Sequence, residues 1–310
     1  MNRIAIDRKS GISAADFARD HIHGGGRPVI VTDATDCWRA RSKWNFEFFK
    51  AAYGSDFVTA SFGLLSEVTK MTKLATFIDY LNAPTEELPG FWLDGRDRKP
   101  LLQPPAPSAS RHYLLAWHAF QRHPELYDDI VPAPYFVADW QMALSPALRD
   151  VFEWTSGREF FSIYVGPEGA LSKLHQDFWH THAYLAQIQG RKQCTLFSPQ
   201  DSEFLYGGEV DPEQPDLARF ERFEQATAYE CVIEPGEVLF IPPKWWHHVR
   251  ALEKSITVSH NFFNGTNFDE HLSRILRELP ILVRGFDESP SSREKLKIKW
   301  RSKGFSDPEL

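Results

Sequence analysis

The stretch that decides the fold is SKLHQDFWHTHAYLAQIQGRK, residues 172–192. Within it, His175 and Asp177 are two residues apart, so on a β-strand both side chains project from the same face. Two such groups on one face can reach a single ion. The stretch therefore predicts half of a metal site, and the remaining ligand has to come from elsewhere in the chain.

A second histidine-containing stretch follows a predicted tight turn. The turn is EPGE at 234–237, and after it the chain runs through an apolar strand into PPKWWHHV, residues 242–249. Adjacent strand residues point to opposite faces, so only one of His247 and His248 can complete the site. Two histidines and one carboxylate on one side of an ion leave its opposite side open, which is the arrangement of non-haem Fe(II) oxygenases.

Composition and charge exclude several classes of protein. The chain has 310 residues, of which 42% are apolar and 14% aromatic, so it can bury a large core and needs no disulfide bonds to be stable. Its net charge of −7 argues against a nucleic-acid-binding protein, which normally carries a basic stripe. Cys37, Cys194 and Cys231 form no CxxC pattern, so neither a disulfide framework nor a cysteine-based zinc site is predicted. No signal peptide or membrane-spanning segment is recognisable, and we expect a soluble cytoplasmic protein with no membrane partner.

Short apolar segments bounded by turn residues predict a mainly β fold with flanking helices. Strands are expected around 27–33, 135–137, 159–166, 183–188, 193–197, 228–233, 238–241 and 255–262. Helices are expected at 44–53, ending at Gly54, and at 73–81, where apolar residues recur at helical spacing. Six or more closely spaced strands favour a sandwich or barrel over a parallel α/β sheet. The polar stretch 201–225 is expected to be a long loop, and such loops often cover sites.

The chain divides into four expected regions. Residues 1–150 form an N-terminal region of helices and strands that packs on the core, 151–265 form the β core, 266–286 a C-terminal helical segment, and 287–310 a charged tail. In the C-terminal segment Leu272, Ile275, Leu276 and Leu279 share one helical stripe. This is more apolar surface than a lone surface helix needs, so we expect docking or a homodimer through this helix.

Three segments of the chain resemble one known family. They are AQIQGRK at 186–192, EPGEVLFIPPKWWHH at 234–248 and the apolar segment at 27–33. Together with His175 and Asp177 they resemble the Jumonji C or cupin-like dioxygenases, which use Fe(II) and 2-oxoglutarate. The asparaginyl hydroxylase that acts on hypoxia-inducible factor and its bacterial relatives are especially similar, although the gap from Asp177 to Lys192 is closer to that of Jumonji lysyl hydroxylases. The resemblance implies a double-stranded β-helix, or jelly roll, with His175, Asp177 and His247 as the metal ligands and catalytic centre.

The same resemblance implies four contacts to 2-oxoglutarate. Lys192 occupies the place where relatives hold the distal carboxylate with a cation, and an ammonium there is sensible because a carboxylate inside a barrel must be paired. Ser172, Tyr113 and Asn261 match family positions near the co-substrate. The structural alternatives are a solvated side chain for Lys192, core packing for Tyr113 and a strand-end turn role for Asn261.

The residues between the metal motif and Lys192 leave further alternatives. His180 and His182 share a face if this segment is extended, and could form a second metal-binding or substrate-binding pair. The favoured interpretation is that they line the pocket mouth or pack near Trp179. Relatives carry an Asn in this stretch, where the chain has Ala183 or Leu185.

The implied reaction is hydroxylation of a C–H bond in a peptide side chain, an amino acid or another small molecule. The implied metal is Fe(II), the co-substrates are 2-oxoglutarate and O2, and the co-products are succinate and CO2. N-demethylation would use the same oxidant on an N-methyl group. Two alternatives stay open: a cupin-type metalloenzyme that does not use 2-oxoglutarate, and a non-catalytic binding module on the same fold. No nucleic-acid partner is expected.

Overall fold

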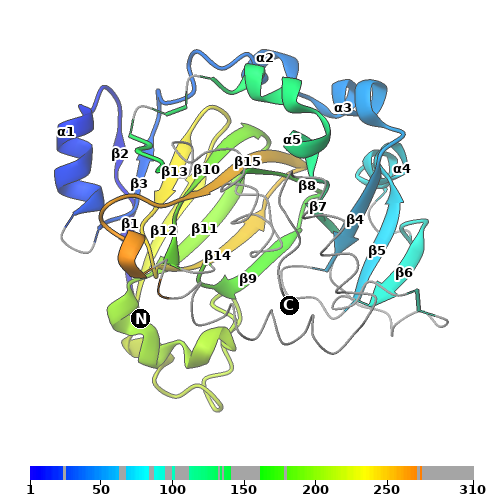
Figure 1. The fold of residues 1–310 in the computed structure, drawn as a ribbon. Coiled ribbons are helices and arrows are strands. Elements are labelled where there is room, and N and C mark those ends of the chain that lie inside the picture. The colour runs from blue at the N-terminus through cyan, green and yellow to red at the C-terminus, as the bar shows by residue number, and fades with distance from the viewer. Residues whose placement is uncertain are drawn as a thin grey trace, which may run out of the picture.

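The computed structural model describes residues 1–23, 26–62, 68–83, 87–94, 100–101, 112–131, 133–134, 136–140, 161–177, 180–270 and 273. Within these residues two β-sheets face each other, and helices cover the outer side of the larger sheet (Figure 1). The same part of the chain contains no helix that is both long and apolar enough to cross a membrane.

The smaller sheet has, in the described residues, five strands in the order β1-β12-β11-β14-β9. Its members are β1 (Asn2–Ala5), β9 (Leu171–His175), β11 (Lys192–Phe197), β12 (Thr227–Ile233) and β14 (Trp246–Ala251). Neighbours pair antiparallel except β1, which runs parallel to β12. This sheet carries His175 on β9 and both His247 and His248 on β14.

The larger sheet has, over the described ranges, ten strands in the order β2-β3-β13-β10-β15-β8-β7-β4-β5-β6. Its central strands are β8 (Phe161–Gly166), β10 (His182–Gln189), β13 (Val238–Ile241) and β15 (Ser255–Phe262). The N-terminal region supplies β2 (Arg8–Lys9), β3 (Val29–Val31), β4 (Phe57–Ser61), β5 (Val68–Lys73), β6 (Phe91–Asp94) and β7 (Tyr113–Ala116). From β8 to β15 the chain passes repeatedly between the two sheets, which is the winding of a jelly roll.

The space between the sheets is filled at one end by apolar side chains. Cross-strand partners share a face, so the β10–β13 pairs Ala183 with Ile241 and Leu185 with Leu239 both point inward. They pack with side chains from the smaller sheet, including Cys194, Leu196, Ile233 and Val249. The other end of this interior face carries polar residues and forms the candidate site.

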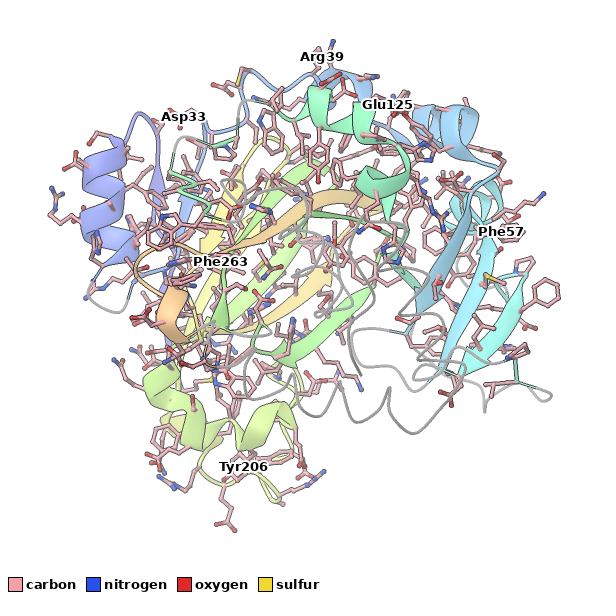
Figure 2. All side chains as sticks on the ribbon, in the orientation of Figure 1. Asp33, Arg39, Phe57, Glu125, Tyr206 and Phe263 are labelled. Atoms are coloured by element: carbon pink, nitrogen blue, oxygen red, sulfur yellow. The ribbon has the colours of Figure 1, made fainter. Side chains whose placement is uncertain are left out.

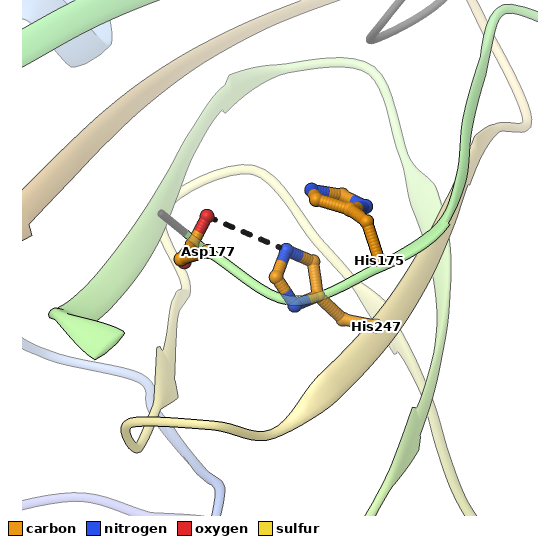
Figure 3. Close-up of side chains that lie close together, drawn as sticks. All are labelled: His175, Asp177 and His247. Carbon is orange, nitrogen blue, oxygen red and sulfur yellow. Dashed lines mark ion pairs between the residues drawn. The ribbon is translucent and has the colours of Figure 1, made fainter. Parts of the chain in front are cut away.

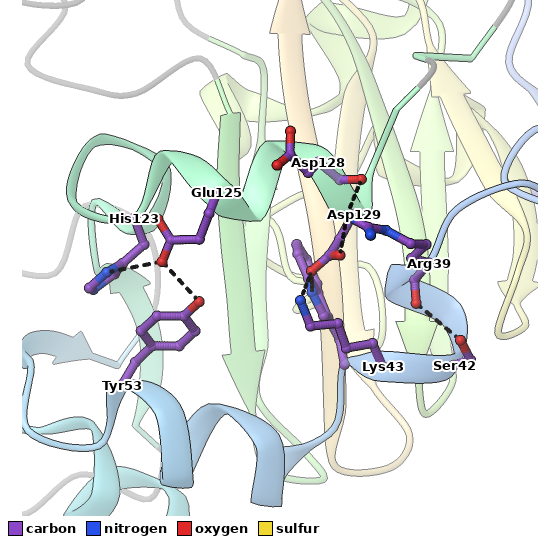
Figure 4. Close-up of polar contacts among 9 residues, drawn as sticks. Arg39, Ser42, Lys43, Tyr53, His123, Glu125, Asp128 and Asp129 are labelled. Atoms are coloured by element: carbon purple, nitrogen blue, oxygen red, sulfur yellow. Dashed lines mark hydrogen bonds and ion pairs between the residues drawn. The ribbon is translucent and has the colours of Figure 1, made fainter.

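The outer face of the larger sheet is covered by short helices. These are α1 (Ala14–Phe17), η1 (Ala18–Ile22), α2 (Ala40–Lys43), α3 (Phe46–Tyr53), α4 (Leu74–Tyr80), α5 (Ala119–Arg122) and η2 (Pro124–Asp129). Asp129 is fully buried and accepts hydrogen bonds from Lys43 Nζ at 2.7 Å and Trp44 Nε1 at 2.9 Å (Figure 4). This paired, buried carboxylate therefore ties η2 to α2 within the helical layer.

The predicted strands of the jelly roll are confirmed, as are the two predicted helices, which form α3 and α4. The strand expected at 135–137 is wrong, because its described residues Phe136 and Val137 lie outside any strand. The ring of Phe136 packs against those of Phe17 and Phe240, with centroids 4.4 Å and 6.1 Å away. An apolar residue at this position therefore serves tertiary packing on the sheet and does not indicate a strand.

The stretch 201–225 contains the 3-10 helices η5 (Tyr206–Gly208) and η6 (Phe223–Gln225) and the end of η4 (Pro199–Phe204). Its apolar side chains pack against Leu174, Phe197 and Trp246 on the outer face of the smaller sheet. Figure 2 shows Tyr206 at the opposite end of the molecule from Arg39 and Glu125. This stretch therefore covers an outer face of the sandwich and not its interior.

Several expectations fall outside the described residues. They include Trp179, most of the proline-rich and serine-rich loop at 99–110, the apolar stripe of the C-terminal helix and the tail at 287–310. The division into four regions stays a prediction, although strands from residues 1–150 clearly join both sheets.

Candidate metal centre and co-substrate pocket

His175 and His247 face each other across two neighbouring strands. They are register partners in the antiparallel pair of β9 and β14, so their side chains project from the same face. Their ring centroids are 4.1 Å apart (Figure 3). Asp177 follows the end of β9, and its Oδ1 lies 3.8 Å from His247 Nε2. The three side chains each offer one ligand atom within 4.8 Å of the others, so one ion could bind to all three.

Backbone hydrogen bonds fix the tautomer of both histidines. His175 Nδ1 lies 2.6 Å from the carbonyl oxygen of Lys173, and His247 Nδ1 lies 3.2 Å from that of Trp245. A carbonyl oxygen only accepts, so Nδ1 donates in each ring and Nε2 is the nitrogen left to bind a metal. Such bonds commonly orient metal-binding histidines. Two imidazole nitrogens and one carboxylate, all on one side of a shared point, fit Fe(II).

The structure separates His247 from its neighbour His248. His248 is buried on the opposite face of β14, where its Nε2 lies 3.2 Å from Glu213 Oε1. Asp211 completes this second cluster, but Arg250 Nε donates to Glu213 at 2.8 Å and already neutralises its carboxylate. Of the two alternatives, His247 is the histidine that lies beside the first metal motif.

His180 and His182 do not join the metal triad. His182 Nε2 lies 3.0 Å from Thr266 Oγ1, and the His182 ring stacks on Phe262 on the outer face of the larger sheet. Burial lowers the pKa of His182 to about 4, so its ring is neutral. His180 Nδ1 lies 2.7 Å from Glu270 Oε1. The two histidines therefore have different partners.

Lys192 lies on the same interior face as His247. It is the first residue of β11, and Leu196 of that strand is the register partner of His247. Residues 192 and 196 share a face, about 13 Å apart along the strand. The Lys192 side chain is buried, and its Nζ donates to Tyr113 Oη at 2.8 Å. No carboxylate among the described residues pairs with it, and burial lowers the pKa of Lys192 to about 7.

The structure thus contradicts the alternative of a solvated Lys192. An ammonium buried beside a phenol and without a counter-charge from the described chain is a site for an anion. It is separated from the metal triad by a few residues of strand, a spacing that a side chain and a small dicarboxylate can span together. These groups share one interior face.

Tyr113 is the first residue of β7, and its ring lies against β8. It is buried and stacks on Tyr164, with ring centroids 5.7 Å apart. A Cβ at Gly166 would come within 2.5 Å of the Tyr113 ring, so glycine is what lets this ring lie against β8. Burial raises the pKa of Tyr113, and its hydroxyl group therefore stays protonated. It accepts from Lys192 and keeps its own proton to donate to a further acceptor.

Ser172 and Asn261 lie on the interior faces of opposite sheets. Ser172 is the register partner of Val249, which belongs to the interior cluster. Asn261 lies directly across from Ala183, and its Nδ2 donates to Thr181 Oγ1 at 2.9 Å. Ala183 is one of the two positions offered in place of the family's Asn. The side-chain amide of Asn261, on the neighbouring strand, therefore lies next to the position where relatives carry an Asn.

Sequence reasoning missed three polar residues of this interior face. They are Tyr164 on β8, Gln187 on β10 and Thr257 on β15, the last two being register partners. Thr257 Oγ1 donates to Gln187 Oε1 at 2.8 Å, and Gln187 Nε2 donates to the carbonyl oxygen of Gly190 at 2.8 Å. Gln187 therefore fixes the turn before Lys192. Polar residues at alternating positions in otherwise apolar strands were the available signal.

Comparison with known proteins assigns the family. The profile of the cupin-like domain matches residues 14–269, a range that includes every candidate site residue and all the described strands except β1 and β2. The chain belongs to the cupin-like domain family. The alternation of strands from β8 to β15 is the cupin-like jelly roll, and the two histidine-containing stretches lie within it.

Three relatives illustrate the range of this cupin-like family. Lysine-specific demethylase 8 of Xenopus tropicalis is 32% identical over 250 residues, covering 78% of this chain and 49% of the relative. Arginine-specific demethylase JMJ20 of Arabidopsis thaliana is 26% identical over 286 residues, covering 84% and 58%. The 2-oxoglutarate and iron-dependent oxygenase JMJD4 of Gallus gallus is 26% identical over 295 residues, covering 88% and 65%. The chain thus spans between about half and two thirds of the length of these relatives.

Proposed function

We propose that this protein is an Fe(II)- and 2-oxoglutarate-dependent oxygenase that hydroxylates a C–H bond of a peptide side chain, an amino acid or another small molecule. The observation that carries the proposal is one interior face with two chemically different ends. His175, Asp177 and His247 converge at one end, and the Lys192 ammonium beside Tyr113 lies at the other. A metalloenzyme that did not use a dicarboxylate would have no need of that buried ammonium.

Different residues of this face bind the metal and the co-substrate. His175, Asp177 and His247 hold the metal from one side and leave the other side to ligands. Lys192 binds the distal carboxylate of 2-oxoglutarate. Bound Fe(II), with 2-oxoglutarate as the reductant, supplies the activation of O2 that oxidises a C–H bond and yields succinate and CO2.

The polar side chains around Lys192 orient the co-substrate. Tyr113 donates its hydroxyl proton to the same carboxylate, while Ser172 and Asn261 line the space between the two ends. The apolar residues of the interior keep stray water from the reaction, which matters for a reactive oxidant. The names of the relatives support this class of chemistry, because one names iron and 2-oxoglutarate and two name demethylation, which also starts at a C–H bond.

A cytoplasmic location and a homodimer through the C-terminal helix are further proposals. Cys37, Cys194 and Cys231 are free, which suits a reducing compartment. The apolar stripe at 272–279 supports the homodimer, and size-exclusion chromatography with light scattering would test it. The proposed partners are otherwise 2-oxoglutarate, O2 and the substrate, with no nucleic acid.

Succinate formation tests the proposed function. The protein is purified without O2, loaded with Fe(II) and given 2-oxoglutarate and O2, alone and with a panel of peptides and amino acids. We expect succinate from the wild type and none from His175→Ala. Failure to bind 2-oxoglutarate, together with no succinate on any member of the panel, would contradict the proposal.

A further inference from the structure

Two residues with a left-handed backbone lie close in sequence to the proposed metal ligands. They are His180, with φ of 53°, and Lys244, with φ of 67°. Such a conformation is unfavourable for a non-glycine residue and persists only where the surrounding structure holds it. His180 follows Asp177 by three positions, and Lys244 precedes His247 by three. Each strained residue therefore lies three positions away from one of the proposed ligands.

One carboxylate holds both strained residues. Glu270 Oε1 lies 2.7 Å from His180 Nδ1, and Glu270 Oε2 lies 2.7 Å from Lys244 Nζ. Burial disfavours the charged form of Glu270, but the hydrogen bonds from Lys244 and His180 outweigh it and lower the pKa of this carboxyl group. Glu270 belongs to the helical residues 268–270, soon after β15. A segment beyond the jelly roll thus reaches back to the metal centre.

Two amide side chains extend the same connection. Asn267 Nδ2 donates to the carbonyl oxygen of His180 at 3.0 Å. Gln176 Nε2 donates to the carbonyl oxygen of Lys244 at 2.6 Å, and Gln176 immediately precedes Asp177. Gln176 and His180, which lie on either side of Asp177 in the sequence, are therefore each tied to another segment.

Asp177 is the ligand that needs this support. His175 and His247 are register partners in a β-ladder, so strand pairing fixes where they point. Asp177 lies beyond the end of β9, and no ladder bond of that strand positions it. Its place opposite His247 therefore depends on the contacts of the described residues near it, Gln176 and His180.

We propose that Glu270 is a positioning residue for the metal centre: by bridging His180 and Lys244, it holds the two strained turns that place Asp177 against His247. The inference rests on the proposed function in that it assigns these ligands to a metal. Partly exposed ion pairs contribute little to global stability. We therefore expect Glu270 to raise the affinity of the site for metal and to reduce the mobility of the two turns, with little effect on global stability.

Binding of Co(II) to the metal-free protein tests this role without any turnover. We expect Glu270→Ala to weaken Co(II) binding by about tenfold or more, the usual loss when a residue that orients metal ligands is removed. Lys244→Gly alone removes one arm of the bridge but relieves the strain at that turn, so it should weaken Co(II) binding less than Glu270→Ala does. Introduced into the Glu270→Ala protein, Lys244→Gly should restore much of the affinity, because glycine adopts the left-handed conformation without strain.

The matched control is Glu213→Ala. Glu213 also bridges a histidine and a cation, His248 and Arg250, but on the opposite face of β14. We expect it to leave Co(II) affinity unchanged. Unchanged Co(II) binding by Glu270→Ala would overturn the proposal, as would equal weakening by Glu213→Ala or a double variant no better than Glu270→Ala.

Hydrogen exchange in the metal-free protein tests independently of metal binding whether Glu270 holds the two turns. Glu270→Ala should speed amide exchange in segments 176–181 and 242–245, and Glu213→Ala should not. Unchanged exchange in both segments would overturn the proposal. Absence of Co(II) binding by the wild type, with faster exchange in Glu270→Ala, would contradict the proposed function and leave the positioning role intact.

Discussion

Lys192 carries the pH dependence expected of the proposed co-substrate site. Burial lowers its pKa from 10.5 to about 7 in the free protein, so the ammonium loses its proton near neutral pH. A dicarboxylate is held by the charged form. Its affinity should therefore fall as pH rises above about 7, by up to about tenfold per pH unit.

Titration of 2-oxoglutarate into Co(II)-loaded protein between about pH 6 and pH 9 measures this fall. The matched variant is Lys192→Arg, because a guanidinium stays charged across the whole range. We expect a nearly flat profile for the arginine variant. A fall of the same steepness in both proteins would assign the pH dependence to another group.

The shifted pKa of Lys192 also predicts how folding stability changes with pH. Between about pH 7 and pH 10.5 the unfolded chain keeps the Lys192 proton while the folded protein has lost it. The unfolded state then binds more protons, so the free energy of unfolding of the metal-free protein should rise with pH in this window. Urea denaturation at several pH values measures the rise. Lys192→Met, which cannot titrate, should reduce it, and an identical rise in both proteins would contradict this assignment.

At the scale of single elements, the strands of the jelly roll were predictable because each is a short apolar run closed by turn residues. β9 and the N-terminal strands β4 to β6 are different. Each of them mixes polar or charged residues with apolar ones and becomes a strand by pairing with its neighbours, and β9 pairs with β14, which is far away in the chain. Their hydrogen-bond partners, and not their composition, decide their structure.

The contact of β8 with Tyr113 predicts the effect of Gly166→Ala. The added Cβ would lie 2.5 Å from the Tyr113 ring and 3.0 Å from Ala170 Cβ, so the ring has to move. Overpacking of this kind typically costs about 1–3 kcal/mol. Because Tyr113 accepts the hydrogen bond of Lys192, the KM for 2-oxoglutarate should rise as well.

Thermal denaturation and co-substrate kinetics measure the two effects of Gly166→Ala. Gly11→Ala is a matched control for a glycine without crowding, since a Cβ there meets nothing within 4 Å. It has a positive φ of 61°, so it should lose some stability and keep the wild-type KM. A wild-type KM in Gly166→Ala would show that Tyr113 does not orient the co-substrate.

At the scale of the whole molecule, the sequence predicted which residue types form the site but not how they meet. Alternation along a strand shows that His247 and His248 face opposite ways, yet the inward choice depends on the register of β14 with β9 and β11. Register is set by all the strands of a sheet together. The bridge from Glu270 to the metal turns was equally invisible, because it joins residues that only the complete jelly roll brings into contact.

The same assembly predicts that metal binding stabilises the entire fold. An ion held by His175, Asp177 and His247 joins β9 to β14 and is bound only by the folded state. At a hundred times its dissociation constant it should add about 2.7 kcal/mol to the free energy of unfolding and raise Tm by roughly 5 °C. Differential scanning calorimetry with Co(II) or Mn(II), compared with chelator-treated protein, measures the shift.

Two neighbouring substitutions sharpen this test, because His247 and His248 are adjacent and buried on opposite faces of one strand. His247→Ala should remove the metal-induced rise in Tm. His248→Ala should lower the Tm of the metal-free protein, since it leaves Glu213 and Arg250 without their histidine neighbour, but keep the rise on adding metal. The reverse pattern would move the third ligand from His247 to His248, and with it the metal to the outer face of the smaller sheet. Lys192 could not then share a co-substrate with the metal, because its side chain lies on the inner face.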